Sequence, residues 1–238
     1  MKYKKDIINS QKDLKIILQN NQELITKAKY GPSKQTKIPL DLNKELAFFV
    51  GAIIGDGHIR KDKFQISIEG ANKKLLKYIQ AICRNIFNRE FNIHPVKIKE
   101  GRKPTFSLLM DSKSIYNLLK DVFEIPSGKK SHIVKAPKHI IESNKQIKKA
   151  FLNGIMSTEG GKRKRGYGMS TASKQLWNDL VKLFNDVKIK TLVDKWTHKK
   201  YKREYYGLSF KKEYLSIIAG VPERSNGVGL GPTGLVPS

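Results

Sequence analysis

Two acidic residues, Asp56 and Glu159, each occur near the end of a nine-residue segment with a shared pattern. The segments are residues 49–57 (FVGAIIGDG) and residues 152–160 (LNGIMSTEG), and a glycine follows the acid in both. Two carboxylates held close together repel each other unless a cation lies between them, and Mg²⁺ suits such oxygen ligands while it retains waters. A metal-bound water is a nucleophile for phosphodiester hydrolysis. The pair therefore predicts metal-dependent hydrolysis of a phosphodiester.

Both acids follow stretches that predict helices, because each stretch is apolar and is preceded by residues that cap helices well. We expect one helix over residues 44–55 and a second that ends at residue 158. The glycine after each acid is typical of a helix stop. The expected caps and stops are Asp41 or Asn43 and Gly57 for the first helix, and Ser143 or Asn144 and Gly160 for the second.

Small residues recur four positions apart in both helices, which places them on one helix face. A face without bulk lets two helix backbones approach closely. We therefore expect the two helices to pack against each other and to bring both acids to one end of the pair. The small residues are Gly51 and Gly55 in the first helix and Gly154 and Thr158 in the second.

The position of the acids favours a function over an ordinary capped core helix. A carboxylate at the C-terminal end of a helix opposes the helix dipole, at a cost of roughly 0.3–1 kcal/mol. Either segment alone is read more simply as a core helix with a polar cap. The same costly arrangement occurring twice, with matching spacing, indicates that both acids are kept for chemistry.

The chain repeats one order of elements, helix-strand-helix-strand-strand-helix, which predicts an α+β fold of two pseudo-symmetric halves around a central helix pair. Alternating segments predict the strands, and apolar stripes at helical spacing predict the helices. In the first half we expect strands near 64–69, 93–99 and 105–110, and helices at 44–55, 73–87 and after Ser112. In the second half we expect strands near 167–171, 191–196 and 205–210, and helices ending at 158, at 174–186 and around 214–218.

Five segments follow from this order. Residues 1–42 form a helical, basic N-terminal arm, with residues 1–30 helical and a Gly-Pro, Lys-rich connector at 30–39; the arm either binds DNA or packs as a helix. The first half spans 43–123, a linker 124–146, and the second half 147–219. Residues 220–238, rich in glycine and proline, are expected to be a flexible tail. The linker lysines (Lys129, Lys130, Lys135, Lys138) either follow a phosphate backbone or keep the linker soluble.

Charge points to the partner. Lys and Arg number 47 and Asp and Glu 21, for a net charge of +26. A body this basic favours a polyanion, and double-stranded DNA leads over an acidic membrane. No apolar run is long enough to span a bilayer, so we expect no membrane partner. The first residues lack the apolar core of a signal peptide, so we expect the cytoplasm or an organellar matrix rather than secretion.

At the two nine-residue segments the sequence resembles the LAGLIDADG homing endonucleases in their monomeric two-motif form, over residues 43–220. The resemblance implies two antiparallel sheets that form a saddle over DNA and a double-strand break at a long, near-asymmetric target. It assigns metal binding to Asp56 and Glu159, and an active-site role to Lys162, three residues past the second acid. We add the residues before the acids, Gly55 and Thr158, as metal ligands.

The expected cofactor is Mg²⁺, with Mn²⁺ as an alternative and Ca²⁺ as a non-catalytic substitute. The resemblance has one departure, because the positions before the second helix of each half hold Gly70-Ala71 and Thr171-Ala172 where family members carry basic or amide residues. This departure keeps open a second interpretation, a catalytically weak DNA- or RNA-binding protein on the same fold, such as an intron maturase or a transcription regulator. Intron RNA therefore stays a candidate partner.

Basic residues gather where the DNA-facing sheets are expected. Strand alternation places about half of them on one sheet face, from which they can enter the major groove. A solvated charge run remains the simpler interpretation of any single cluster. The expected DNA-binding residues are Lys97, Lys99, Arg102, Lys103, Arg163, Lys164, Arg165, Lys195, Lys199, Lys200, Lys202 and Arg203.

Overall fold

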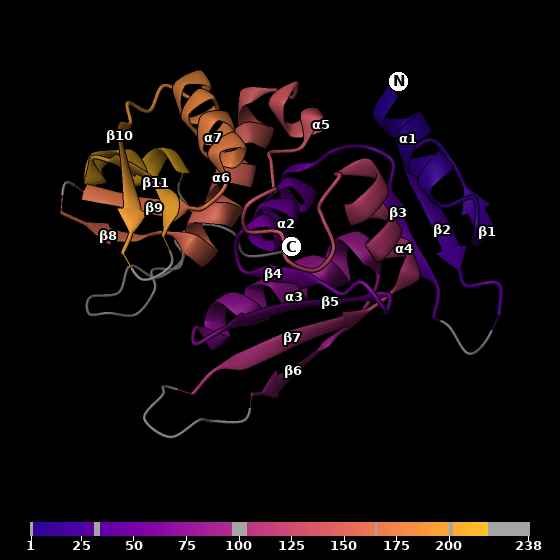
Figure 1. The fold of residues 1–238 in the computed structure, drawn as a ribbon. Coiled ribbons are helices and arrows are strands. Elements are labelled where there is room, and N and C mark those ends of the chain that lie inside the picture. The colour runs from indigo at the N-terminus through magenta and orange to yellow at the C-terminus, as the bar shows by residue number, and fades with distance from the viewer. Residues whose placement is uncertain (1, 31–33, 97–103, 165, 200–201, 219–238) are drawn as a thin grey trace.

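Two helices, α2 (Lys44–Gly55) and α6 (Lys145–Glu159), pack against each other at the centre of the molecule (Figure 1). The computed structural model describes residues 2–30, 34–96, 104–164, 166–199 and 202–218. Asn43 caps α2 by accepting the Leu46 N–H, and Asn144 caps α6 by accepting the N–H groups of Gln146 and Ile147. The two predicted helices are confirmed, with one of the two suggested caps chosen in each.

The glycines set how closely these helices approach. A Cβ added to Gly51 would lie 3.0 Å from the Ile155 nitrogen and 3.2 Å from the Gly154 Cα, and it would overlap the Phe151 carbonyl oxygen. A Cβ added to Gly154 would lie 2.9 Å from the Ala52 nitrogen. The two backbones are therefore in direct contact, as the spacing of small residues predicted.

The first half contains α2 and a four-stranded antiparallel sheet of order β4-β5-β7-β6. Helix α3 covers this sheet, and a short helix α4 continues into a π-helical turn. The elements are β4 (Gly57–Ile59), β5 (Gln65–Gly70), α3 (Lys73–Phe87), β6 (Asn92–Pro95), β7 (Phe106–Asp111), α4 (Lys113–Asn117) and the π-helical turn Leu118–Val122.

The second half repeats this plan around α6, with a sheet of order β10-β11-β9-β8. A short helix α5 (Lys138–Ile141) lies in the segment between the halves. The remaining elements are β8 (Gly161–Arg163), β9 (Gly166–Thr171), α7 (Lys174–Asp186), β10 (Leu192–His198), β11 (Arg203–Phe210) and the 3-10 helix Lys212–Ile218. The fold is α+β with two similar halves, as predicted.

Three details differ from the expectation. Each half has one more strand than predicted, because β4 and β8 begin directly after the acid-bearing helix and are too short to show alternation. Gly57 starts β4 and does not cap α2, whose C-cap is Asp56, whereas Gly160 does cap α6. The last predicted helix is a 3-10 helix.

The helical prediction for residues 1–42 is wrong beyond Ser10. Helix α1 (Lys2–Ser10) leads into a three-stranded antiparallel sheet of β1 (Lys15–Gln19), β2 (Glu23–Lys27) and β3 (Thr36–Pro39). The Asn20 side chain makes the β1–β2 turn by accepting the N–H groups of Gln22 and Glu23 at 2.8 Å. Asparagine favours such turns and β-branched residues favour strands, so local turn chemistry overrides a weak helical period. The tail 220–238 lies outside the described residues.

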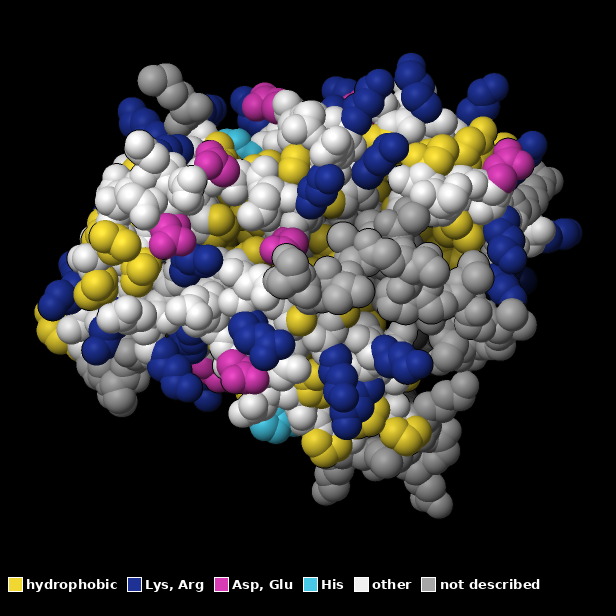
Figure 2. All heavy atoms as spheres, turned by 180° about the vertical axis from the view of Figure 1, so that it is seen from behind, with side chains coloured by type: hydrophobic (Ala, Val, Ile, Leu, Met, Phe, Trp, Pro, Cys, Tyr) yellow, Lys and Arg dark blue, Asp and Glu magenta, His cyan; other side chains and the backbone are white. Residues whose placement is uncertain are grey.

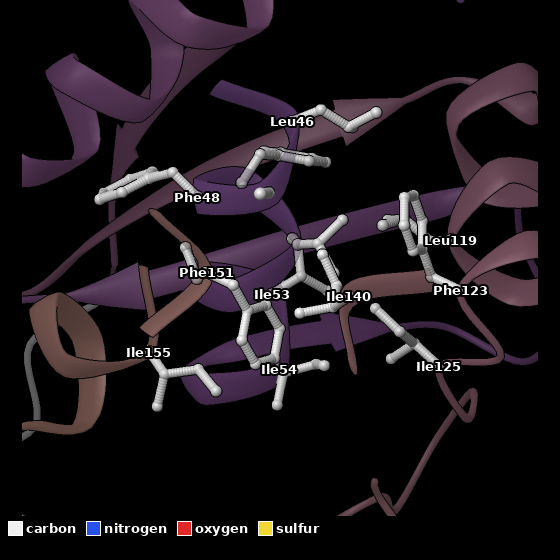
Figure 3. Packing of buried hydrophobic residues seen from close by; sticks show 14 of the residues in the cluster. Leu46, Phe48, Ile53, Ile54, Leu119, Phe123, Ile125, Ile140, Phe151 and Ile155 are labelled. Atoms are coloured by element: carbon white, nitrogen blue, oxygen red, sulfur yellow. The ribbon is translucent and has the colours of Figure 1, made fainter. Parts of the chain in front are cut away.

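The core is continuous across the helix pair (Figure 3). Phe48, Ile53 and Ile54 of α2 pack with Phe151 and Ile155 of α6, all of them buried. Within the first half, the Phe49 and Phe87 rings meet edge to face with centroids 5.2 Å apart. Among the described residues, no helix is both long and apolar enough to cross a membrane.

We expect Gly154→Val to destabilise the fold because the added carbons would overlap the Phe48 carbonyl of α2. Overpacking of this kind costs about 1–3 kcal/mol, or a fall in Tm of roughly 3–10 °C for a chain of this size. Gly161→Ala is the matched control, because a Cβ at Gly161 would meet nothing within 4 Å. Thermal unfolding of both variants tests the contact, which an unchanged Gly154→Val midpoint would contradict.

Candidate active site at the ends of the paired helices

Asp56 and Glu159 mark the C-terminal ends of α2 and α6. Asp56 is the C-cap of α2, and its N–H donates to the Ile53 carbonyl. Glu159 is the last residue of α6, and the next N–H, that of Gly160, donates to the Met156 carbonyl at 3.0 Å. Both side chains are half-buried. The sequence folds this way because a side chain caps each helix at its start, and the chain continues into an edge strand directly after each acid.

The structure brings the two acids to the same end of the helix pair. A Cβ built on Gly55 would lie 3.2 Å from Cγ of Glu159, so Glu159 rests against the last turn of α2, the helix that Asp56 caps. The predicted juxtaposition of the two helix ends is therefore present. The roles of the acids in metal binding and catalysis stay predictions.

A lysine from the linker, Lys130, reaches the same place. Its Nζ donates to the carbonyl oxygens of Ile53, Ile54 and Gly55, the last at 3.0 Å. A cation is favoured there because the carbonyls at a helix C-terminus carry the negative end of the dipole. The Lys130 ammonium therefore stabilises the C-terminal end of α2, where the Asp56 carboxylate interacts unfavourably with the helix dipole.

The electrostatics of Lys130 connect it to both acids. Burial lowers the pKa of Lys130 to about 8, and the carboxylates of Glu159 and Asp56 oppose this shift by favouring the ammonium form. Both carboxylates are thus close enough to act on the Lys130 ammonium. The site therefore places one half-buried cation near two carboxylates from opposite halves.

The path of the linker explains why Lys130 lies here. The Gly128 N–H donates to the Ile59 carbonyl of β4 at 2.7 Å, and further along the Ser173 hydroxyl donates to the Val134 carbonyl at 2.6 Å. The segment therefore runs from the first sheet, past the end of α2, to the start of α7. Sequence reasoning saw only a lysine-rich linker, because nothing local to residues 127–139 shows this path.

The other residues predicted for the site, Gly55, Thr158 and Lys162, differ in where the structure places them. The Gly55 carbonyl lies at the site, where it accepts from Lys130. The Thr158 hydroxyl is buried and donates to Ile155 and Gly154 of its own helix, at 3.0 and 3.3 Å. Lys162 lies on β8 opposite Tyr167, and its side chain is exposed. The positions before α3 and α7 adjoin ordinary helix caps, Asn72 and Ser173.

The oxygen donors fit a hard divalent cation. Among the residues that the structure describes, no group of three or more histidines, cysteines or acids is gathered to hold a metal. The site thus offers two carboxylates and a backbone carbonyl. Such a set suits Mg²⁺, which binds one or two carboxylates and takes its other ligands from water and substrate phosphates.

The predicted DNA-binding residues divide between the two faces of the second sheet. Arg163, whose guanidinium donates to the Ser170 hydroxyl at 3.2 Å, and Arg203, 3.1 Å from the His132 ring, lie on the face away from the helices. Lys195 lies on the helix side, paired with Glu204. Lys164, Lys199 and Lys202 are exposed. Outside the described residues lie Lys97, Lys99, Arg102, Lys103, Arg165 and Lys200.

Basic side chains outnumber acidic ones in the chain, 47 to 21. Figure 2 shows one face of the molecule, over which Lys and Arg side chains are spread with only a few acids among them. This distribution agrees with the net charge of +26. A polyanion would therefore meet favourable charge over a wide area.

Solved structures resemble this fold. The structure of I-DmoI in complex with DNA and Mn has a TM-score of 0.55 and 18% identity, and the match covers 75% of this chain and 97% of that one. The structure of I-DmoI with DNA and Ca has a TM-score of 0.52 and 18% identity, and covers 72% and 84%. I-DmoI is a homing endonuclease. This chain has the homing endonuclease fold. At this identity the likeness concerns the fold.

Curated proteins match over a small part of their length, and no family model matches the chain. The replication factor C small subunit of Methanocaldococcus jannaschii is 33% identical over 143 residues, which are 59% of this chain and 7% of the relative. The probable translation initiation factor IF-2 of the same organism is 26% identical over 186 residues, 75% of this chain and 15% of the relative. A DNA polymerase of that organism is 25% identical over 169 residues, 68% and 10%.

We expect the pKa of Lys130 to fall below about 8 in the double variant Asp56→Asn, Glu159→Gln, because the two carboxylates raise it. The change is measured by NMR titration of protein labelled at lysine Cε. Lys195 is the internal reference, because Glu204 raises its pKa and both lie on the second sheet. A Lys130 pKa that is the same in both proteins would show that the acids do not face it.

Proposed function

We propose that this protein is a site-specific, metal-dependent endonuclease that makes a double-strand break at a long, near-asymmetric DNA target. The observation that carries the proposal is the meeting of Asp56, Glu159 and Lys130 at one end of a helix pair within the homing endonuclease fold. Each acid comes from a different half, so one chain supplies both. We therefore also propose that it acts as a monomer.

Different residues of the protein would bind the cation, balance charge and contact DNA. Asp56 and Glu159 would hold the divalent cation, Mg²⁺ or Mn²⁺ for cleavage, with Ca²⁺ as the non-catalytic substitute. When bound, the cation supplies an activated water and neutralises phosphate charge. The Lys130 ammonium offsets the repulsion between the acids and holds the last turn of α2 in place. Arg163, Arg203 and the exposed lysines would contact phosphates and fix the register on DNA.

The curated relatives support a mobile origin. Their names describe a replication factor, a translation factor, an ATP synthase, an aminotransferase and a DNA polymerase, and the matching segment covers 7–19% of each. A segment shared by proteins with such different names does not account for any one of those activities. We propose that it belongs to intron- or intein-type mobile machinery.

We expect Asp56→Asn or Glu159→Gln to abolish DNA cleavage while DNA binding is retained. The target comes from selection of cleaved sites out of a randomised duplex library in Mg²⁺, and binding is then measured in Ca²⁺. Glu90→Gln removes an acid elsewhere and should cleave normally. Cleavage by both site variants contradicts the assignment. Binding without cleavage by the unaltered protein, or a preference for intron RNA, favours the binding-protein interpretation.

We expect Lys130→Met to slow cleavage by about 10²-fold or more, since it removes a positive charge held beside both acids. Affinity for the selected duplex should change little, because Lys130 is inside the site rather than on the surface. Lys129→Met is the matched control, since it removes the neighbouring charge of the same linker. Single-turnover cleavage and binding assays separate the two effects, and equal rates for both variants would count against a role for Lys130.

A further inference from the structure

The second sheet turns an unusual set of residues away from its helices. Tyr206 packs on Trp177 of α7, with ring centroids 5.4 Å apart, and Leu208 and Phe210 are buried on the same side. Because side chains alternate along a strand, Tyr205 and Ser209 lie on the opposite face. This face, away from α6 and α7, is the one that carries Arg163 and Arg203.

Two large apolar side chains, Leu192 and Trp196, lie on the outer strand β10 of that face, with Asp194 between them. Trp196 lies directly across from Tyr205, and the two rings stack with centroids 6.0 Å apart and planes 17° apart. Leu192, four residues earlier on the same strand and the same face, is 50% exposed, and Trp196 is 36% exposed. Together with the Tyr205 ring, these two side chains form an apolar strip that Asp194 interrupts, and such a strip favours a contact surface at this edge.

The strands beside this edge have little bulk. Ser209 pairs with Gly168, and Gly168 pairs with Gly161, at which an added Cβ would meet nothing within 4 Å. The carboxylate of Asp194 lies over Gly207, which is between Tyr205 and Ser209 on the same face of β11. The aromatic edge therefore borders strands whose outward side chains are small at Gly161, Gly168 and Ser209.

The corresponding face of the first sheet is mostly polar, although Leu109 of β7, which pairs with Ser67, also lies on it. On β5, Ile66 and Ile68 point into the core, which leaves Gln65, Ser67 and Glu69 on the other side. His58 lies opposite Ser67, and Ser107 lies opposite Glu69. These side chains line one groove. The first sheet thus offers mainly hydrogen-bond donors and acceptors on this face, whereas the second sheet adds two aromatic rings and Leu192 along its edge strand.

We propose that the second sheet recognises its part of the duplex through thymine methyl groups packed against Trp196, Tyr205 and Leu192, while the first sheet recognises its part by hydrogen bonds. The thymine methyl is the apolar group that base pairs present in the major groove. Arg163 and Arg203 on the same face would attract the flanking phosphates. The stacked rings already cover each other, so they favour the edge of a base pair over an unpaired base inserted between them.

This inference rests on the proposed function, and its test uses the selected duplex target. Thymines are replaced by deoxyuridine in one half of the target or in the other, which removes only methyl groups. In Ca²⁺, affinity should fall roughly fourfold for each methyl that the edge covers, in one half only. In the Trp196→Ala variant, deoxyuridine replacement should no longer lower the affinity. In the Leu192→Ala variant, which changes the same face, the loss of affinity on replacement should be smaller than in the unaltered protein.

Tyr30→Ala is the control, because Tyr30 is an exposed aromatic residue outside both sheets. It should keep the full response to deoxyuridine. The inference is overturned if deoxyuridine changes affinity equally in both halves or in neither, if folded Trp196→Ala and Leu192→Ala retain the full response, or if single-stranded DNA binds more tightly than the duplex. Failure to bind any selected duplex would instead contradict the proposed function.

Discussion

The contact between the backbones of α2 and α6 is the constraint on which the rest of the structure depends. Gly51 and Gly154 leave no room for a side chain between the helices, so both axes are fixed at one short separation. The two halves are then positioned relative to each other by backbone rather than by adaptable side chains. Whatever projects from the ends of these helices is held with the same precision, which is what a site assembled from two halves requires.

That close approach creates an electrostatic problem at one end. Two helix C-termini and two carboxylates, those of Asp56 and Glu159, lie together, and each helix end adds partial negative charge. Lys130 offsets part of this negative charge by donating to three carbonyls of α2. Its ammonium loses hydration on burial, which lowers its pKa, and the acids offset part of that cost. The linker therefore contributes to the site as well as joining the halves.

The sequence was sufficient for elements with a strong local signal. Helices α3 and α7 begin and end where their apolar stripes predict, and the duplicated glycine pattern predicted the contact of α2 and α6. Prediction failed where the signal is short or distant. Strands β4 and β8 have three residues each, too few for a period, and the turn at Asn20 was decided by one side chain. Lys130 reaches the site only through a path that crosses from one half to the other.

The two halves share a plan but differ in surface, and the difference has a physical origin. The buried sides of both sheets must pack against helices, so Ile66 and Ile68 in one half and Leu208 and Phe210 in the other are similarly apolar. The opposite faces carry no such packing requirement and are free to diverge. One is lined by Gln65, Ser67 and Glu69, and the other ends in a stacked pair of aromatic rings. Two such faces would not contact the two ends of the proposed duplex target alike, so pseudo-symmetry in the fold is compatible with the proposed target that lacks symmetry.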